Sequence, residues 1–449
     1  MYDPLLDKDP GCNAPYPASY WAGQGQAEPG YPALQQERSA DLVVIGAGYT
    51  GLNAARVLAG RFSQHVVVLE AHQPGWGCSG RNAGFVLKGT GRLGAVQLTE
   101  RFGLETAQAC YREYRQAFEQ VATLCQKGAI DCQAQPPGYY KLAHQPRFLP
   151  LFEQQQQLLN QHFGEQLQYL SQAELQQTHL ADQQACGALL DPDCFGLNPL
   201  QLALGYSRLA EQAGATIYGG SPVLGWQKQQ GLHRLQTPQG SVTAKKVLIA
   251  TNGYTPKDFH PLLNGRILPV QSSIIVTRPL TEHERSACGF RGQPIVMDTR
   301  ALKYYYRLLP DGRLLFGGRG AIQGRHADKP RYTKALRSAL EYSFPALAGI
   351  DIAYQWSGWV AVSLDDLPHL YQAPQDSSYA GVSYAAGYCG SGLSFSALAG
   401  QRLAELAMGQ SIPNLPCYQR PLPAFPFARW RRLGQWLYYQ WGRWQDKRH

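Results

Sequence analysis

The sequence predicts an α/β protein in which a Rossmann-type domain, with a doubly wound parallel sheet, is interleaved with an α+β domain that carries an antiparallel sheet. Two buried apolar runs predict the parallel sheet: a β-α-β pattern over residues 41–70, and "KVLIATNGY" over residues 246–254. Strand patterns joined by a Pro-Asp-Gly turn at 310–312 predict the antiparallel sheet. A chain of 449 residues is long enough for both domains.

The first element is a nucleotide-binding turn. "LVVI" at 42–45 is typical of a buried parallel strand, and it leads through G-x-G-x-x-G at 46–51 into an alanine-rich helix. A second apolar run, "VVVLE" at 66–70, ends in Glu70, whose carboxylate can accept a hydrogen bond from a ribose hydroxyl. The pattern therefore predicts a dinucleotide site, which NAD and FAD fit equally well.

The glycine spacing alone is weak evidence, because "GTGRLG" at 89–94 repeats it with Glu113 at a similar offset. No buried strand leads to Glu113, and the residues around it alternate with a helical period. We therefore interpret the second match as a chance glycine-rich loop.

The segment after Glu70 favours FAD. "GWGCSGRNAGF" at 75–85 places four glycines around Ser79, Arg81 and Asn82. Such a loop lets backbone N–H groups approach a pyrophosphate and a flavin edge closely. A plain surface loop and an NAD-dependent dehydrogenase remain the alternatives.

With these motifs the sequence resembles the FAD-dependent D-amino acid oxidase superfamily, and within it the bacterial γ-glutamylputrescine oxidases and related pipecolate oxidases. The resemblance also rests on "YYRLLPDGRLLFGGR", "LDDLPH" and "GYCGSGLSFSALAGQRLAEL", and it runs from "PASYWAG" to the C-terminal helix. It implies oxidation of a C–N bond in a small amine, imino acid or amino acid. Hydride passes to flavin N5, and the imine then hydrolyses or cyclises.

The resemblance implies an FAD site assembled from segments far apart in the chain. The β-α-β unit would hold the adenosine ribose, the loop at 79–82 the phosphates and ribityl chain, and the Val223 backbone the adenine. The residues expected to bind the cofactor are Gly46, Gly48, Tyr49, Thr50, Gly51, Glu70, Ala71, Gly77, Ser79, Gly80, Arg81, Asn82, Ala83, Gly84, Val223, Thr251, Asn252, Gly253, Gly390, Ser391, Gly392 and Leu393.

The expected domains follow from the same segments. An N-terminal extension covers 1–40, and a discontinuous FAD-binding domain covers 41–90, 199–266 and 360–410. The substrate domain covers 91–198, with helical periodicity, and 267–359, and a C-terminal segment covers 411–449.

A helix is expected to begin near Leu393 with its N-terminus aimed at the flavin pyrimidine. Its dipole would stabilise the negative charge of the reduced ring. Ser391 stands where many relatives carry histidine, which leaves the helix dipole more of this task.

Amine oxidation needs orientation and a dry, partly aromatic pocket more than it needs a catalytic triad. We expect Tyr306, Arg307, Tyr388 and Trp356 to act in catalysis, with an arginine fork for a substrate carboxylate and aromatic faces for an amine. Strand alternation puts Tyr304 and Tyr306 on one face and Tyr305 and Arg307 on the other, so only one pair can face the flavin.

Charge and composition narrow the partners. The net charge is +9, of which +5 comes from the segment after Arg429, so a nucleic-acid-binding core is not expected. The ten cysteines form no metal-ligand pattern, so no metal is expected. Reduced thiols and the lack of a secretory signal or long apolar run at this N-terminus favour a cytoplasmic protein.

The 427–449 segment predicts a basic amphipathic helix, with an apolar stripe of Trp430, Leu433, Leu437, Trp441 and Trp444. We favour docking of this helix on the protein's own surface, with peripheral contact to an anionic membrane as the alternative. The electron acceptor is O2 or a quinone, and membrane contact would favour the quinone.

Overall fold

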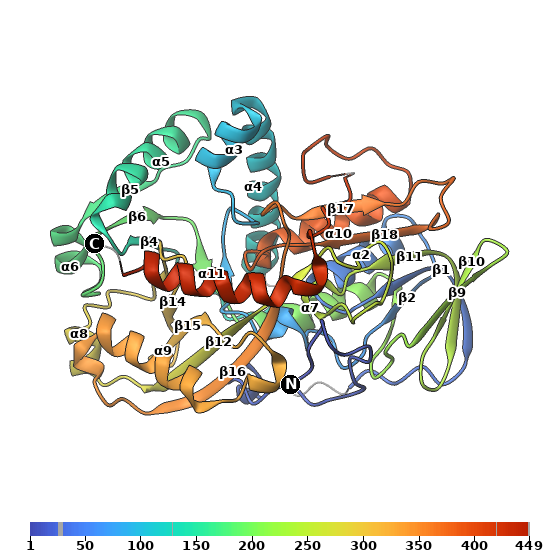
Figure 1. Ribbon diagram of the computed structural model, residues 1–449, viewed down its shortest axis with the longest axis horizontal. Coiled ribbons are helices and arrows are strands. Elements are labelled where there is room, and N and C mark those ends of the chain that lie inside the picture. The colour runs from blue at the N-terminus through green and yellow to red at the C-terminus, as the bar shows by residue number, and fades with distance from the viewer. Residues whose placement is uncertain (26–29, 128, 419, 448–449) are drawn as a thin grey trace.

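Two eight-stranded sheets organise the protein and lie side by side in Figure 1. The computed structural model describes residues 1–25, 30–127, 129–418 and 420–447. The chain passes between the sheets several times, so each sheet is built from distant segments.

The first sheet, on the right of Figure 1, has a parallel centre. Its strand order is β17-β18-β11-β1-β2-β8, and the hairpin β9–β10 pairs with β11. Val44 of β1 pairs with Val68 of β2 and Leu248 of β11, as the apolar runs predict. The strands are β1 (Glu37–Ile45), β2 (Val66–Leu69), β8 (Thr216–Tyr218), β9 (Gly225–Gln229), β10 (Leu232–Gln236), β11 (Ser241–Ile249), β17 (His369–Gln372) and β18 (Val382–Ala386).

Helices cover one face of this sheet. They are α2 (Tyr49–Gly60), α4 (Leu104–Gln126), α7 (Pro199–Gln212) and α10 (Leu393–Ala407), which form the largest core cluster with Val44 and Val68. The other face, with Val43 and Val67, packs against Leu235 of the β9–β10 hairpin and against Leu34. The predicted fold class is confirmed, with the difference that strands rather than helices form this second covering layer.

The second sheet has the order β16-β12-β15-β14-β13-β4-β6-β5 and is antiparallel except between β13 and β4. Its strands are β4 (Tyr139–Ala143), β5 (Gln168–Ser171), β6 (Gly187–Asp191), β12 (Leu268–Pro279), β13 (Ile295–Asp298), β14 (Tyr305–Leu308), β15 (Arg313–Arg319) and β16 (Ile352–Val362). The helix α9 (Pro330–Ser343) packs on it through Leu336 and Leu340. The predicted turn joins β14 and β15, with Gly312 at φ +79°. Strands β4 to β6 lie in a region whose periodicity predicted helices.

The remaining elements connect or cap these layers. They are α1 (Tyr20–Gly23), β3 (Phe85–Val86), α3 (Ala95–Phe102), α5 (Leu149–His162), α6 (Gln172–Thr178), β7 (Phe195–Gly196), α8 (Glu282–Ala287) and α11 (Arg431–Gln445). The predicted domain boundaries stay a prediction. The strands of the first sheet fall within 37–69, 216–249 and 369–386, and those of the second within 139–191 and 268–362.

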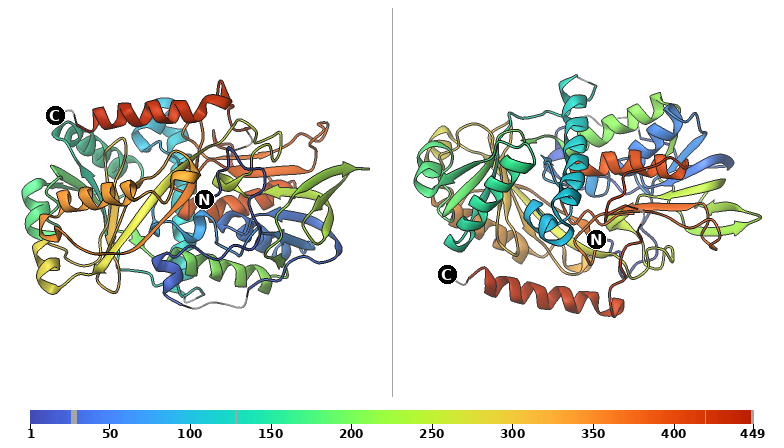
Figure 2. Two further views of the ribbon diagram at one scale, coloured as in Figure 1. Left: turned by 60° about the horizontal axis from the view of Figure 1, so that its bottom comes forward. Right: turned by 90° about the horizontal axis from the view of Figure 1, so that it is seen from above.

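The C-terminal helix α11 lies along the outside of the molecule in both views of Figure 2. It packs on the protein through Gln435, Tyr439 and Gly442, which are buried. The expected apolar stripe does not make this contact, because its five residues are 48–55% exposed. No helix in the described ranges is long and apolar enough to cross a bilayer.

Candidate active site

A deep cavity lies between the two sheets, where the parallel strands of the first sheet end. Its lining includes residues just after β1, at the end of β2, after β11 and after β18, together with residues of β12, β14, β15 and β16. The carboxyl ends of parallel strands are where open α/β sheets bind ligands.

The turn after β1 shapes one end of the cavity. An added Cβ on Gly51 would lie 1.9 Å from the Gly46 carbonyl oxygen, so only glycine allows the helix to start this close to the strand. The Glu70 carboxylate accepts hydrogen bonds from the backbone N–H groups of Ala47 at 2.7 Å and His72 at 3.0 Å. Burial raises the pKa of this carboxyl. Glu70 therefore fixes the turn from the position where it could also receive a ribose hydroxyl.

The loop at 75–84 is held by its own side chains. Ser79 Oγ accepts from the Tyr49 backbone N–H at 3.1 Å. Asn82 donates to the Ser79 carbonyl at 2.9 Å and accepts from the Gly84 N–H at 2.8 Å. The Arg81 guanidinium donates to the Trp76 carbonyl at 2.6 Å and lies 4.0 Å from the Trp76 ring centroid. The loop is thus ordered before any ligand contacts it.

Two helix N-termini open onto the cavity. The N-cap residues of α2 and α10 are Gly48 and Gly392, which provide no side-chain cap, and neither helix has an acidic residue in its first turn. Unpaired N–H groups at a helix start attract negative charge. The hydroxyls of Thr50 in α2 and Tyr388 before α10 lie 2.7 Å apart and join the two ends. This donor set fits a bound pyrophosphate and a flavin ring that gains negative charge.

The residues predicted to bind the cofactor line the cavity with three exceptions, Gly51, Gly80 and Gly84. An added Cβ on these three would approach the carbonyl oxygens of Gly46, Gly75 and Leu197 to within 2.4 Å. The three glycines therefore permit close packing behind the lining. Their expected direct contact with the cofactor does not fit this position.

One face of the second sheet forms the opposite wall. Ser272 pairs with Arg319, and Tyr305 pairs with both Met297 and Gly317, so strand alternation directs these residues to the same side. All of them except Gly317 line the cavity. An added Cβ on Gly317 would lie 2.1 Å from the Tyr305 ring, so this glycine leaves the space that the ring fills. The hydroxyls of Ser272 and Tyr305 are 2.7 Å apart.

Three cations line this part of the cavity: Arg92, Lys303 and Arg319. Arg92 donates to the Tyr438 hydroxyl at 2.7 Å. Lys303 and Arg319 form no hydrogen bond or ion pair with any residue that the structure describes. Burial, together with the nearby positive charges of Lys141 and Arg92, lowers the pKa of the Lys303 ammonium to about 8. The sequence analysis missed these three residues.

Of the four residues expected to act in catalysis, only Tyr388 lines the cavity. Arg307 is fully buried, donates to the carbonyls of Leu197 at 2.6 Å and Gly84 at 3.4 Å, and lies over Trp21. This position does not fit the predicted carboxylate fork, although Arg307 shares its strand face with Tyr305.

Tyr306 and Trp356 also lie outside the lining. Tyr306 is on the other face of β14, where its hydroxyl donates to Asp182 at 2.6 Å and its ring stacks on Phe316. Trp356 donates to the Arg81 carbonyl at 2.8 Å. Trp356 therefore supports the 75–84 loop from behind, and neither residue is placed to contact a substrate.

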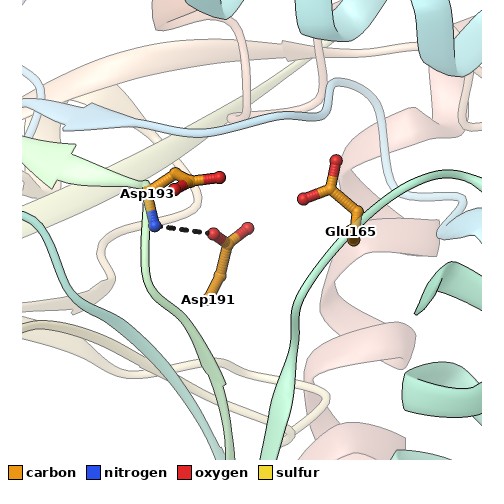
Figure 3. Close-up of side chains that lie close together, drawn as sticks. All are labelled: Glu165, Asp191 and Asp193. Carbon is orange, nitrogen blue, oxygen red and sulfur yellow. Dashed lines mark hydrogen bonds between the residues drawn. The ribbon is translucent and has the colours of Figure 1, made fainter.

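A cluster of carboxylates outside the cavity has the spacing of a metal site. Glu165, Asp191 and Asp193 bring their oxygens within 4.8 Å of one another (Figure 3). The Lys88 ammonium pairs with all three, at 3.0 Å from Asp191 and 2.9 Å from Asp193, and Arg115 pairs with Glu165. Lysine and arginine already neutralise these acids, so the cluster is an ion-pair network.

The fold and the cavity define a dinucleotide-dependent oxidoreductase, because a β-α-β phosphate site and a substrate wall meet in one cavity. The chain belongs to the FAD dependent oxidoreductase family, whose model matches residues 41–406. It is therefore an FAD-dependent amine or amino acid oxidoreductase, and NAD as cofactor is not supported.

Several relatives span most of the chain. A probable oxidoreductase OrdL of Rhizobium meliloti is 32% identical over 402 residues, covering 89% of this chain and 90% of the relative. The gamma-glutamylputrescine oxidoreductase of Escherichia coli is 30% identical over 410 residues, covering 90% and 93%. Among solved structures, glycine oxidase from Geobacillus kaustophilus matches with a TM-score of 0.68 at 21% identity, covering 84% of this chain and 96% of that one. The structural likeness shows the same fold.

Proposed function

We propose that the protein oxidises the C–N bond of a small amine that carries a carboxylate, and that the imine product hydrolyses or cyclises. The observation that carries this proposal is the pair of cations, Lys303 and Arg319, that line the wall facing the nucleotide turn and have no partner among the described residues. Cations without a partner in a largely enclosed cavity favour an anionic ligand.

The side chains around the cations suit the rest of such a substrate. The Arg319 guanidinium can bind a carboxylate through two parallel hydrogen bonds, and Lys303 adds a positive charge. The Tyr305 ring, Met297 and Ile274 provide apolar surface that excludes water from the reacting carbon. FAD, when bound, supplies the acceptor for the hydride.

The cofactor residues proposed from the sequence keep that role where they line the cavity. Gly46, Gly48 and the α2 N-terminus would hold the pyrophosphate, and Glu70 the adenosine ribose. Residues 390–393 and the α10 N-terminus would stabilise the reduced flavin, and Tyr388 would fix α10 to α2.

Two substrates remain in competition. The likeness to gamma-glutamylputrescine oxidoreductase supports a long diamine derivative whose carboxylate is far from the reacting C–N bond. L-Pipecolate and similar amino acids carry the carboxylate on the reacting carbon itself. Anaerobic bleaching of the flavin absorbance by both compounds, and by their analogues without a carboxylate, distinguishes these cases and tests the proposal.

The electron acceptor is proposed to be O2 or a quinone. The rate at which each reoxidises the substrate-reduced enzyme decides between them. Rapid reoxidation by air favours an oxidase, and reoxidation by a soluble quinone with slow consumption of O2 favours a dehydrogenase.

A further inference from the structure

The helix α11 has the reverse of the usual orientation for a surface helix. Its apolar residues point outward, and we call them the outward face: Trp430, Leu433, Trp436, Leu437, Trp441 and Trp444, each 48–55% exposed. They account for much of the large apolar surface that the described chain exposes. Contiguous exposed apolar residues of this kind mark an interaction surface.

Polar contacts fix this orientation. Arg432 donates to the Pro269 carbonyl at 2.9 Å and to Asp3 at 2.6 Å. At the other end, Asp446 accepts from the Ala301 N–H at 2.8 Å. Tyr439, buried between these ends, accepts a hydrogen bond from Gln435. Because both ends and the middle of the helix are anchored, rolling it to bury the tryptophans would break all of these contacts.

The charges beside the outward face are basic. Arg429, Arg443 and Lys447 are exposed, whereas Asp446 is the one acidic residue between positions 427 and 447 and its side chain is only 14% exposed. Tryptophan and leucine with flanking arginine and lysine are typical of helices that lie in the plane of an anionic membrane surface.

We infer that the outward face of α11 binds an anionic membrane surface. The tryptophan and leucine side chains enter the region below the lipid headgroups, and Arg429, Arg443 and Lys447 pair with lipid phosphates. A second copy of the chain fits less well, because a symmetric contact through this face would bring two basic clusters together without acidic partners.

The surface lies beside the cationic wall of the cavity. Tyr438 of α11 accepts the hydrogen bond of Arg92, and Leu302, next to Lys303, packs on Gly442. The membrane-binding side is therefore the substrate side of the molecule. The inference itself does not depend on the proposed substrate.

The test is flotation of the FAD-loaded protein with phosphatidylglycerol-containing vesicles and with pure phosphatidylcholine vesicles. The test variant carries Leu433→Gln, Trp436→Gln and Leu437→Gln, which keep the helix and remove apolar surface. The matched control carries Leu151→Gln, Leu232→Gln and Tyr342→Gln, three exposed apolar residues on other elements. Melting temperature and flavin absorbance show that each variant is folded.

We expect the wild type and the control to float with the anionic vesicles and the test variant to bind them at least about tenfold more weakly. A second variant, with Arg429→Gln, Arg443→Gln and Lys447→Gln, should bind about a hundredfold more weakly, since each basic residue contributes about a tenfold change near an anionic surface. Equal binding by the wild type and the Leu433/Trp436/Leu437 variant would overturn the inference. So would absence of wild-type binding, including the case in which light scattering shows a dimer that only this variant dissociates.

Discussion

The hydroxyl of Tyr388 lies 2.7 Å from the hydroxyl of Thr50, although the two residues are 338 positions apart. This hydrogen bond joins the loop before α10 to the first turn of α2, the two helices whose N-termini open onto the cavity. It therefore fixes the two groups of N–H donors relative to each other.

Replacement of Tyr388 by Phe should weaken FAD binding. The change leaves the buried Thr50 hydroxyl without its partner, which costs about 1–3 kcal/mol, or about a five- to hundredfold rise in the FAD dissociation constant. Titration of the apoprotein with FAD measures it. Tyr384→Phe is the matched control, because it removes an equally buried hydrogen bond from the Leu422 N–H outside the cavity. Equal loss of FAD affinity in both variants would contradict the account.

Replacement of Arg319 by Met should weaken the binding of carboxylate-bearing substrates. Loss of a charge-assisted hydrogen bond costs about 1.5–3 kcal/mol, so the apparent dissociation constant should rise by about ten- to a hundredfold. Arg307→Met should instead lower the melting temperature and leave the affinity of the folded protein unchanged, because Arg307 binds the carbonyls of Leu197 and Gly84. The opposite pattern would return the carboxylate fork to Arg307.

The affinity for a carboxylate should fall as the pH rises through about 8. Lys303 is charged below its pKa of about 8 and neutral above it, so the attraction for an anion is present at lower pH and lost at higher pH. Cyclohexanecarboxylate, which has no amine to titrate, is the suitable probe, followed by its effect on flavin absorbance. Lys303→Arg should make the affinity independent of pH in this range. A flat profile in the wild type would exclude Lys303 from the anion site.

Replacement of Lys88 by Met should destabilise the protein without affecting chemistry. It leaves Glu165, Asp191 and Asp193 with only Arg115 as a partner, and breaking a buried ion pair costs about 3–5 kcal/mol. Denaturant unfolding measures the loss, which should diminish at acid pH as the carboxylates take up protons. Millimolar Ca²⁺ or Mn²⁺ should leave the melting temperature of the wild type unchanged. A rise would show that the cluster binds metal.

Local patterns carried most of the fold and much of the cofactor site. The turn at 46–51, Glu70 and the glycine-rich start of α10 are contiguous motifs, and their spacing reflects the steric needs of one turn or one helix start. Helical periodicity misled at 139–191, because short strands that pair with distant strands depend on tertiary contacts rather than on their own pattern.

The substrate wall could not be predicted in the same way. Alternation correctly separated Tyr305 from Tyr306, but it could not decide which face meets the cavity, nor that Arg307 lies beyond the cavity on that face. Lys303 and Arg319 carry no motif, and they reach the cavity only because β14 and β15 pair. The stripe of α11 was visible in the sequence, but its outward direction depends on contacts at Asp3 and Ala301.

The central claim is that this cavity oxidises a carboxylate-bearing amine, and anaerobic flavin reduction tests it most directly. The purified, yellow protein is mixed without oxygen with γ-glutamylputrescine, L-pipecolate, putrescine and piperidine, and the flavin absorbance is followed. The account predicts bleaching by at least one of the two carboxylate-bearing compounds and, for that compound, much slower bleaching by its analogue without a carboxylate. Equal or faster bleaching by the analogues, or no bleaching by either carboxylate, would contradict it.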